Sequence, residues 1–136
     1  MVCTFFGNKN TPQEAKEKIY CQIKRLIGEG VTTFYVGNHG AFDKMVLSAL
    51  VELKKEFSQI DYAVVLAYLP KETKDYETVF PEEVSQAPMK YRIDRRNKWM
   101  LKRADVVVTY IFNTAGHALT YKEMAMQSGK RIIELS

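Results

Sequence analysis

Cysteine is scarce in this sequence of 136 residues, and long apolar runs are absent. The two cysteines, Cys3 and Cys21, fall in different expected elements, a usage typical of reduced thiols rather than of a disulfide framework. No charged leader with an apolar segment opens the chain, and no apolar run approaches the roughly 20 residues that cross a bilayer. We therefore expect a cytoplasmic protein with no signal peptide and no membrane partner.

A large excess of charge of either sign is also lacking. Twenty basic and 16 acidic residues give a net charge of +4, which by itself does not indicate a nucleic-acid partner. Histidine occurs only as His39 and His117, without the spacing of a metal-binding motif, so we expect no metal site and no cofactor. The two imidazoles are candidates for contacts with a base or a ribose, and plain surface exposure is the alternative.

What the sequence does contain is a regular alternation of strand-like and helix-like segments. Apolar and β-branched runs predict strands at residues 2–6, 31–36, 62–69, 105–112 and 131–135. Apolar residues at helical spacing predict helices at 12–27, with Thr11 as N-cap, and at 42–57, 90–104 and 118–128. This order predicts an α/β fold: a single Rossmann-like three-layer domain, with a doubly wound, mostly parallel sheet of about five strands.

Residues 70–88 lack any periodicity and contain three prolines, which predicts one long loop. Loops of this length often act as lids. If the loop closes over a ligand, Tyr76 or Phe80 could cover a base. The alternative is a surface loop held in place by packing of the same two aromatic side chains.

Ligands of doubly wound sheets bind beyond the carboxyl ends of the strands, where three predicted loops combine glycine with asparagine and a basic or imidazole side chain. The candidate ligand-binding residues in these loops are Gly7, Asn8, Lys9, Gly37, Asn38, His39, Gly40, Asn113, Gly116 and His117. Glycine lets the backbone approach a ligand closely, and the helix that follows offers free N–H groups to an anion. The loops therefore predict a site for a phosphate-bearing ligand, although tight turns require glycine even without one.

Two polar residues of the segment 89–105, Arg96 and Asn97, fall within the apolar stripe of the predicted helix. A buried arginine needs a partner, because an unpaired buried charge is costly. The partner is either an internal carboxylate, with Asp43 and Asp105 as candidates, or a ligand phosphate. The pattern leaves both open and makes Arg96 and Asn97 candidate site residues.

Several motifs resemble those of the SLOG superfamily, which joins the DNA-processing protein DprA (SMF) and the LOG cytokinin-activating enzymes. "TFFGNK" is similar to the family's first strand ending in Gly-His-Arg, and "VGNHGAFD" to its glycine-rich turn closing on an aspartate. "RRNKWMLKRAD" and "AGHALTYKEMAMQSGK" resemble the segments around the family's last two helices. The resemblance covers essentially the whole chain and is nearest to the small bacterial and phage proteins of the YpsA/YoqJ type. It implies a SLOG-like nucleotide-binding domain over residues 1–136.

The resemblance also implies three activities. LOG enzymes hydrolyse the N-glycosidic bond of nucleoside monophosphates with an arginine and a glutamate, other SLOG domains are thought to sense nucleotide signals, and DprA binds single-stranded DNA. Here the LOG phosphate loop is absent, and Leu119 occupies the position of the glutamate. Glu123 lies about one helical turn later, on the polar side of its predicted helix. Asp43 and Glu123 are therefore the catalytic candidates only if the protein is an enzyme.

The function predicted first is binding of a nucleotide or nucleotide-derived small molecule, as a sensor or sequestering module. The alternative is a nucleotide N-glycosidase or deoxyribosyltransferase-like enzyme. A third hypothesis is binding of single-stranded nucleic acid, because seven Lys or Arg residues between Lys90 and Arg103 accompany Tyr91 and Trp99, which could stack on bases. A homo-oligomer is also expected, since oligomers are common in the superfamily.

Overall fold

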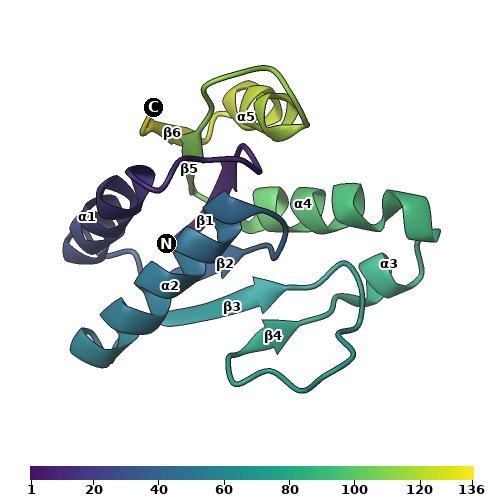
Figure 1. Ribbon diagram of the computed structural model, residues 1–136, viewed down its shortest axis with the longest axis horizontal. Helices are drawn as coiled ribbons and strands as arrows, with labels where there is room; N and C mark the ends of the chain where they lie inside the picture. The colour runs from purple at the N-terminus through teal and green to yellow at the C-terminus, as the bar shows by residue number, and fades with distance from the viewer.

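A single parallel sheet organises the computed structural model, which describes residues 1–136 (Figure 1). Its six strands lie in the order β4-β3-β2-β1-β5-β6, and every neighbouring pair is parallel. They are β1 (Val2–Gly7), β2 (Thr33–Val36), β3 (Asp61–Val65), β4 (Thr78–Val79), β5 (Val106–Tyr110) and β6 (Arg131–Glu134). The predicted Rossmann-like α/β fold is confirmed, with one short strand more than the five expected.

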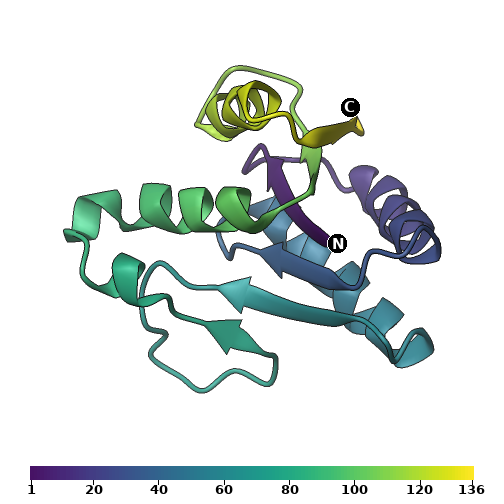
Figure 2. The same cartoon turned by 180° about the vertical axis from the view of Figure 1, so that it is seen from behind.

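Helices cover both faces of the sheet, as the two opposite views show (Figures 1 and 2). The helices are α1 (Ala15–Gly28), α2 (Ala41–Glu56), α3 (Glu82–Ser85), α4 (Arg92–Arg103) and α5 (Ala118–Gln127), and a 3₁₀ turn at Met89–Tyr91 precedes α4. α1 and α2 pack on one face, whereas α4 and α5 pack on the other. The chain changes direction at β1, which pairs with β2 on one side and with β5 on the other.

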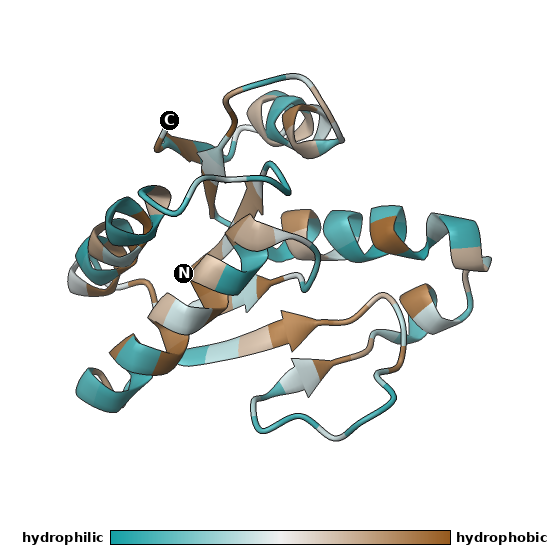
Figure 3. Ribbon diagram, in the orientation of Figure 1, coloured by the Kyte–Doolittle hydropathy of each residue, from teal (hydrophilic) through white to brown (hydrophobic).

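Alternating side chains of the central strands feed two separate cores. Cys3 and Phe5 of β1 belong to the core beneath α1 and α2, while Phe6 belongs to the core beneath α4 and α5. All five residues of β5 are buried, as expected for a central strand covered on both faces. Hydrophilic and hydrophobic residues alternate along the helices, whereas the carboxyl half of β3 is hydrophobic (Figure 3). The core thus holds the carboxyl ends of β1, β2 and β5 in fixed register.

The predicted start of the first helix is wrong. Helix α1 begins at Ala15, and Thr11 is buried in the preceding turn, where its hydroxyl donates a hydrogen bond of 2.6 Å to the carbonyl of Asn8. The Thr-Pro signature therefore closes the turn after β1 instead of capping the helix. The third strand is also shorter than predicted, because it ends at Val65.

The segment 70–88 is not the structureless loop that its composition predicts. It contains β4 and α3, and the backbone of β3 holds β4 through hydrogen bonds from Val64 to Glu77 and from Leu66 to Val79. Tyr76 and Phe80 are half-buried against the core of α1 and α2. This packing supports the alternative of a segment held in place by its aromatic side chains. No helix of the structure combines the length and the apolar composition needed to cross a membrane.

Candidate functional site

A cavity of about 430 Å³ lies at the carboxyl edge of the sheet, where the chain changes direction. It is framed by the loops after β1, β2 and β5, by one face of α4 and by the start of α5. Nine residues predicted to bind or act on a ligand line it: Gly7, Asn8, Lys9, His39, Asp43, Arg96, Asn97, Gly116 and His117. Loops far apart in the sequence therefore do converge on one hollow.

Five predicted site residues do not line the cavity. Gly37, Asn38 and Gly40 lie behind it in the β2–α2 loop, and Asn113 lies in the loop after β5. Glu123 is exposed on α5, outside the cavity. Asp43 is therefore the only one of the two catalytic candidates that a ligand in the cavity would meet.

Arg96 is only 2% exposed, and its guanidinium bonds to neutral acceptors. Its Nε donates to Oδ1 of Asn97 at 2.7 Å, and its Nη1 donates to the carbonyl oxygen of Val65 at 3.0 Å and to Oδ1 of Asn38 at 3.3 Å. No carboxylate lies within 4.0 Å of the guanidinium. Asp105, one of the two carboxylates predicted as a partner of Arg96, instead accepts a hydrogen bond from the backbone N–H of Val2, at the amino ends of the strands.

The fourth partner of Arg96 fixes the tautomer of His39. Nη2 of Arg96 lies 3.1 Å from Nδ1 of His39, and because a guanidinium only donates, Nδ1 must accept. The imidazole is therefore neutral and carries its proton on Nε2. Burial, and after it the charges of Arg96 and Lys9, lower the pKa of His39, which keeps the ring neutral.

Asp43 stands beside this network, in the first turn of α2. Its Oδ2 accepts a hydrogen bond of 3.0 Å from the backbone N–H of His39. Burial raises the pKa of Asp43 to about 6, against the lowering effects of that hydrogen bond and of Arg96. A Cβ on Gly37 would lie 2.9 Å from both Asp43 Oδ2 and the Arg96 guanidinium, so packing alone requires glycine there.

Asn8 fixes the loop that forms the opposite wall. Its side chain is 3% exposed, and its Oδ1 accepts from the backbone N–H of Phe112 at 2.8 Å. Its Nδ2 donates to the carbonyls of Ala115 at 3.3 Å and Asn113 at 3.5 Å. With these contacts made, the Asn8 side chain holds the wall rather than a ligand.

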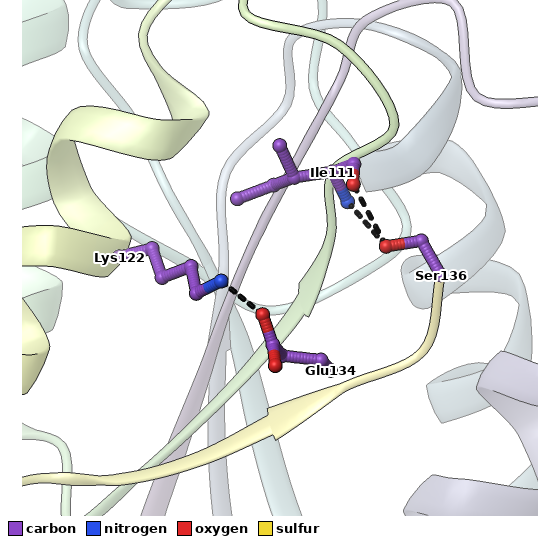
Figure 4. A network of polar contacts seen from close by, with 4 residues as sticks. All are labelled: Ile111, Lys122, Glu134 and Ser136. Carbon is purple, nitrogen blue, oxygen red and sulfur yellow. Dashed lines mark hydrogen bonds and ion pairs between the residues drawn. The ribbon is translucent and has the colours of Figure 1, made fainter.

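The far side of the same loop is anchored near the sheet edge. The hydroxyl of Ser136 both donates to and accepts from the backbone of Ile111, and Lys122 on α5 pairs with Glu134 on β6 (Figure 4). These contacts tie the two ends of the loop, at Ile111 after β5 and at Lys122 on α5, to β6 and the residues that follow it. The loop that forms this wall is thus held by the Asn8 side chain on one side and by β6 and Ser136 on the other.

Several lining residues were not among the predicted site residues. Those from α4 and the turn before it are Lys90, Ile93, Asp94 and Met100, and Phe5, Phe6, Ala115, Ala118 and Tyr121 complete the lining. The residues on α4 and its preceding turn recur with Arg96 and Asn97 at spacings of three and four, so they share one helix face. That spacing was the signal available in the sequence. The contact between Tyr121 and Asp94 had no such signal, since the two residues lie 27 positions apart in the sequence, and in the structure Tyr121 Oη is 2.6 Å from Asp94 Oδ1.

The cavity carries three cationic side chains, Lys9, Lys90 and Arg96, against the two carboxylates Asp43 and Asp94. Helix α5 begins at its mouth without a side-chain cap, so its first N–H groups are free. No group of three or more His, Cys, Asp or Glu residues is arranged to hold a metal ion.

No model of a known protein family matches the chain, and no curated protein is detectably similar to it in sequence. Two solved structures are similar to it. DNA processing protein A (DprA) from Streptococcus pneumoniae matches 97% of the chain with a TM-score of 0.72 and 14% sequence identity. DprA from Helicobacter pylori matches 98% of the chain with a TM-score of 0.68 and 10% sequence identity. The fold is that of DprA. The chain spans 49% and 64% of these two proteins, and the H. pylori DprA binds single-stranded DNA. At such identities the likeness to DprA concerns the fold alone.

Proposed function

We propose that the cavity binds a phosphorylated nucleotide, as a sensing or sequestering module. The observation that carries the proposal is the buried guanidinium of Arg96, whose charge no carboxylate within 4.0 Å neutralises, in the wall of a cavity that also presents Lys9 and Lys90. The protein already uses four hydrogen-bond contacts of Arg96, so its charge attracts an anion to the cavity while Lys9 and Lys90 are the cations left to contact it. The volume of about 430 Å³ falls within the range of small-ligand sites.

The test is a panel of nucleoside monophosphates, deoxynucleotides, NAD, ADP-ribose and cyclic nucleotides. Each compound is incubated with the protein, the mixture is ultrafiltered, and both fractions are separated by chromatography. We expect one class of compound to be retained and recovered intact. Retention of none of them would contradict the proposal. Release of a free base would favour a glycosidase, for which Asp43 is the predicted catalytic carboxylate that lines the cavity.

Lysine variants show whether the cavity is the site. Lys9→Ala and Lys90→Ala should each weaken retention roughly tenfold, the value of one charge-assisted hydrogen bond. Lys18→Ala, on the exposed face of α1, is the matched control and should leave retention unchanged. Equal losses in all three variants would place the binding elsewhere. Arg96 is unsuitable for this test, because its side chain also holds the surrounding loops.

Single-stranded DNA is the second candidate, supported by the fold shared with DprA and by an exposed aromatic residue next to the cavity. Tyr91 is 49% exposed, and the ammonium of Lys90 lies 5.1 Å from the centre of its ring. Other parts of the basic run are engaged within the protein: Lys98 pairs with Asp94, and Arg103 stacks on Trp99 at 3.8 Å. Affinity for an oligonucleotide that falls steeply with salt, and falls further in Tyr91→Ala, would favour this candidate.

Two finer assignments are also proposals. A place among the small YpsA/YoqJ-type SLOG proteins is supported by the motifs of the first two loops, Gly7-Asn8-Lys9 and Gly37 to Asp43. A homo-oligomer is supported by the frequency of oligomers in the SLOG superfamily and by exposed apolar side chains such as Met126 on α5, which is 58% exposed. Sedimentation velocity would show a monomer if the second assignment is wrong.

A further inference from the structure

The cavity changes in character from its floor to its mouth. The floor carries apolar side chains of the core beneath α4 and α5 that are at most 5% exposed: Phe6, Met100 and Tyr121. The lining residues exposed at the mouth are Lys9, Lys90, Ala115, Gly116 and His117, of which the two lysines carry charge. Arg96 is the only cation among the buried lining residues, and four of its contacts already go to the protein. A ligand that fills the cavity therefore places an apolar part inside and an anionic part at the mouth.

The floor offers a fixed aromatic surface. The rings of Phe6 and Tyr121 stack with their centres 5.2 Å apart and an angle of 23° between their planes. The Tyr121 hydroxyl is anchored by its hydrogen bond of 2.6 Å to Asp94, which holds the ring in place. Because the two rings stack on each other and are each 5% exposed, a nucleobase would contact them on the sides that face the cavity.

Asp94 supplies a polar group in the side wall of the cavity, next to this aromatic pair, with its side chain 41% exposed. Its Oδ1 accepts from Tyr121, and its Oδ2 pairs with Lys98 at 3.0 Å. Against the raising effect of burial, the bonds from Tyr121 and Lys98 lower the pKa of Asp94, so the group is an ionised acceptor. Each carboxylate oxygen can accept a further hydrogen bond, whereas a phosphate or a carbonyl oxygen placed against it would be repelled.

The common nucleobases differ in what they offer to such a carboxylate. Guanine presents two adjacent donors, N1–H and the 2-amino group, which match the two oxygens of one carboxylate. Adenine and cytosine present a single amino group next to a ring nitrogen that accepts, and uracil presents one N–H between two carbonyls. Only guanine therefore places a donor opposite each of the two carboxylate oxygens, with no acceptor atom of the base facing either oxygen.

We propose that the cavity selects a guanine nucleotide, with the base on Phe6 and Tyr121, its N1–H and amino edge on Asp94, and its phosphate at Lys9 and Lys90. This inference rests on the proposed nucleotide binding and adds to it the identity of the base and the orientation of the ligand. The same chemistry is met by a free guanine nucleotide and by a guanylate unit within a single strand. The test distinguishes these two sources.

Isothermal titration calorimetry with GMP, IMP, AMP and ribose 5-phosphate tests the base preference. We expect GMP to bind about tenfold or more tightly than AMP, as for one bidentate contact to a base, with IMP between them because it lacks the 2-amino group. A guanine-containing tetranucleotide binding no better than GMP identifies the free nucleotide as the ligand, and one binding much better identifies the strand. Equal affinity for GMP, AMP and ribose 5-phosphate would overturn the base site while leaving phosphate binding intact. Failure of all four compounds and of the tetranucleotide would overturn both proposals.

Asp94→Asn tests the residue. An asparagine still accepts from Tyr121 but offers an amide in place of the second oxygen, so GMP should lose its tenfold advantage while AMP is unaffected. Lys98→Ala removes the exposed partner of the same carboxylate without removing the acceptor pair, and should retain the preference. Circular dichroism and the melting temperature verify the fold of both variants. A preference for GMP that survives Asp94→Asn would overturn the role of Asp94.

Discussion

Arg96 and Asp43 flank Gly37 without forming an ion pair, and this has a consequence for the charge of Asp43. A carboxylate in a direct pair with arginine has a lowered pKa. Here the guanidinium is bonded to amide, imidazole and carbonyl acceptors, and burial dominates at the carboxyl group. Because its pKa is raised to about 6, Asp43 loses its negative charge when the pH falls only slightly below the physiological range.

The raised pKa of Asp43 predicts a pH dependence of stability. The folded protein holds this proton up to about pH 6, whereas the ordinary value is 3.8, so the folded state binds more protons between these values. The free energy of unfolding therefore falls as the pH rises from about 4 to 6. Asp43→Asn, which still accepts from the His39 N–H, should be more stable than the parent at pH 7.5 by on the order of 2 kcal/mol.

Urea denaturation at pH 4.0, 5.5 and 7.5 measures this difference, which should shrink toward pH 4. Asp75→Asn, at an exposed position in the segment before β4, is the control and should follow the parent at every pH. A constant difference between Asp43→Asn and the parent over the whole range would contradict the raised pKa.

At the scale of elements, the loop between β5 and α5 depends on Asn8, which lies in the loop after β1. Asn8→Ala removes the acceptor of the Phe112 N–H and the donor to Ala115 and Asn113. We expect a loss of about 1–3 kcal/mol in the free energy of unfolding, the cost of leaving such groups unpaired. Amide hydrogens of residues 112–117 should also exchange faster, as measured by mass spectrometry.

Asn10→Ala is the matched control, since Asn10 is exposed and its side chain makes no hydrogen bond in the structure. Its exchange pattern should equal that of the parent. If residues 112–117 exchange at the same rate in both variants, the loop is held by other contacts, such as those of Ser136 and Lys122.

The elements that the sequence predicted are those with long apolar patterns. The helix around Met45 and Leu53 and the buried run at Val106 repeat their periodicity over whole elements, so no distant contact is needed to recognise them. β4 and α3 have two and four residues, too few for a period to appear. Thr11 looked like a helix cap because its hydroxyl suits that role, but the carbonyl of Asn8 is closer in the folded chain.

The same distinction separates the predicted and missed parts of the site. Loop residues such as Lys9 and His39 were predicted because the strand order alone brings loop ends together. One partner of Arg96 is the backbone carbonyl of Val65 in β3. Every residue has such a carbonyl, so the amino-acid sequence gives no sign of this contact. Asp94 and Tyr121 belong to separate elements, and their contact exists only once α4 and α5 lie on the same face.

At the scale of the whole molecule, Arg96 joins the two sides of the sheet. It belongs to α4 on one face, and it bonds to Asn38 and His39 in the loop that leads to α2 on the other. Arg96→Met should lower the free energy of unfolding by about 3 kcal/mol or more, because it leaves buried acceptors, the Val65 carbonyl among them, without a donor.

Arg95→Met is the control for that substitution, because Arg95 is the exposed neighbour on the same helix. It should change the free energy of unfolding by no more than about 0.5 kcal/mol. Chemical denaturation of the two variants side by side provides the comparison, and similar values for both would contradict the central role of Arg96.

The reversal of direction at β1 fixes the position of the crevice independently of its side chains. A crevice opens beside β1 because the chain leaves that strand toward β2 and later returns beside it as β5, whichever side chains happen to surround the opening. Proteins that agree at only 14% of positions can therefore share this fold, since it does not depend on the residues around the opening. Substitutions at the rim can therefore change which ligand the crevice accepts while the core keeps the crevice in place.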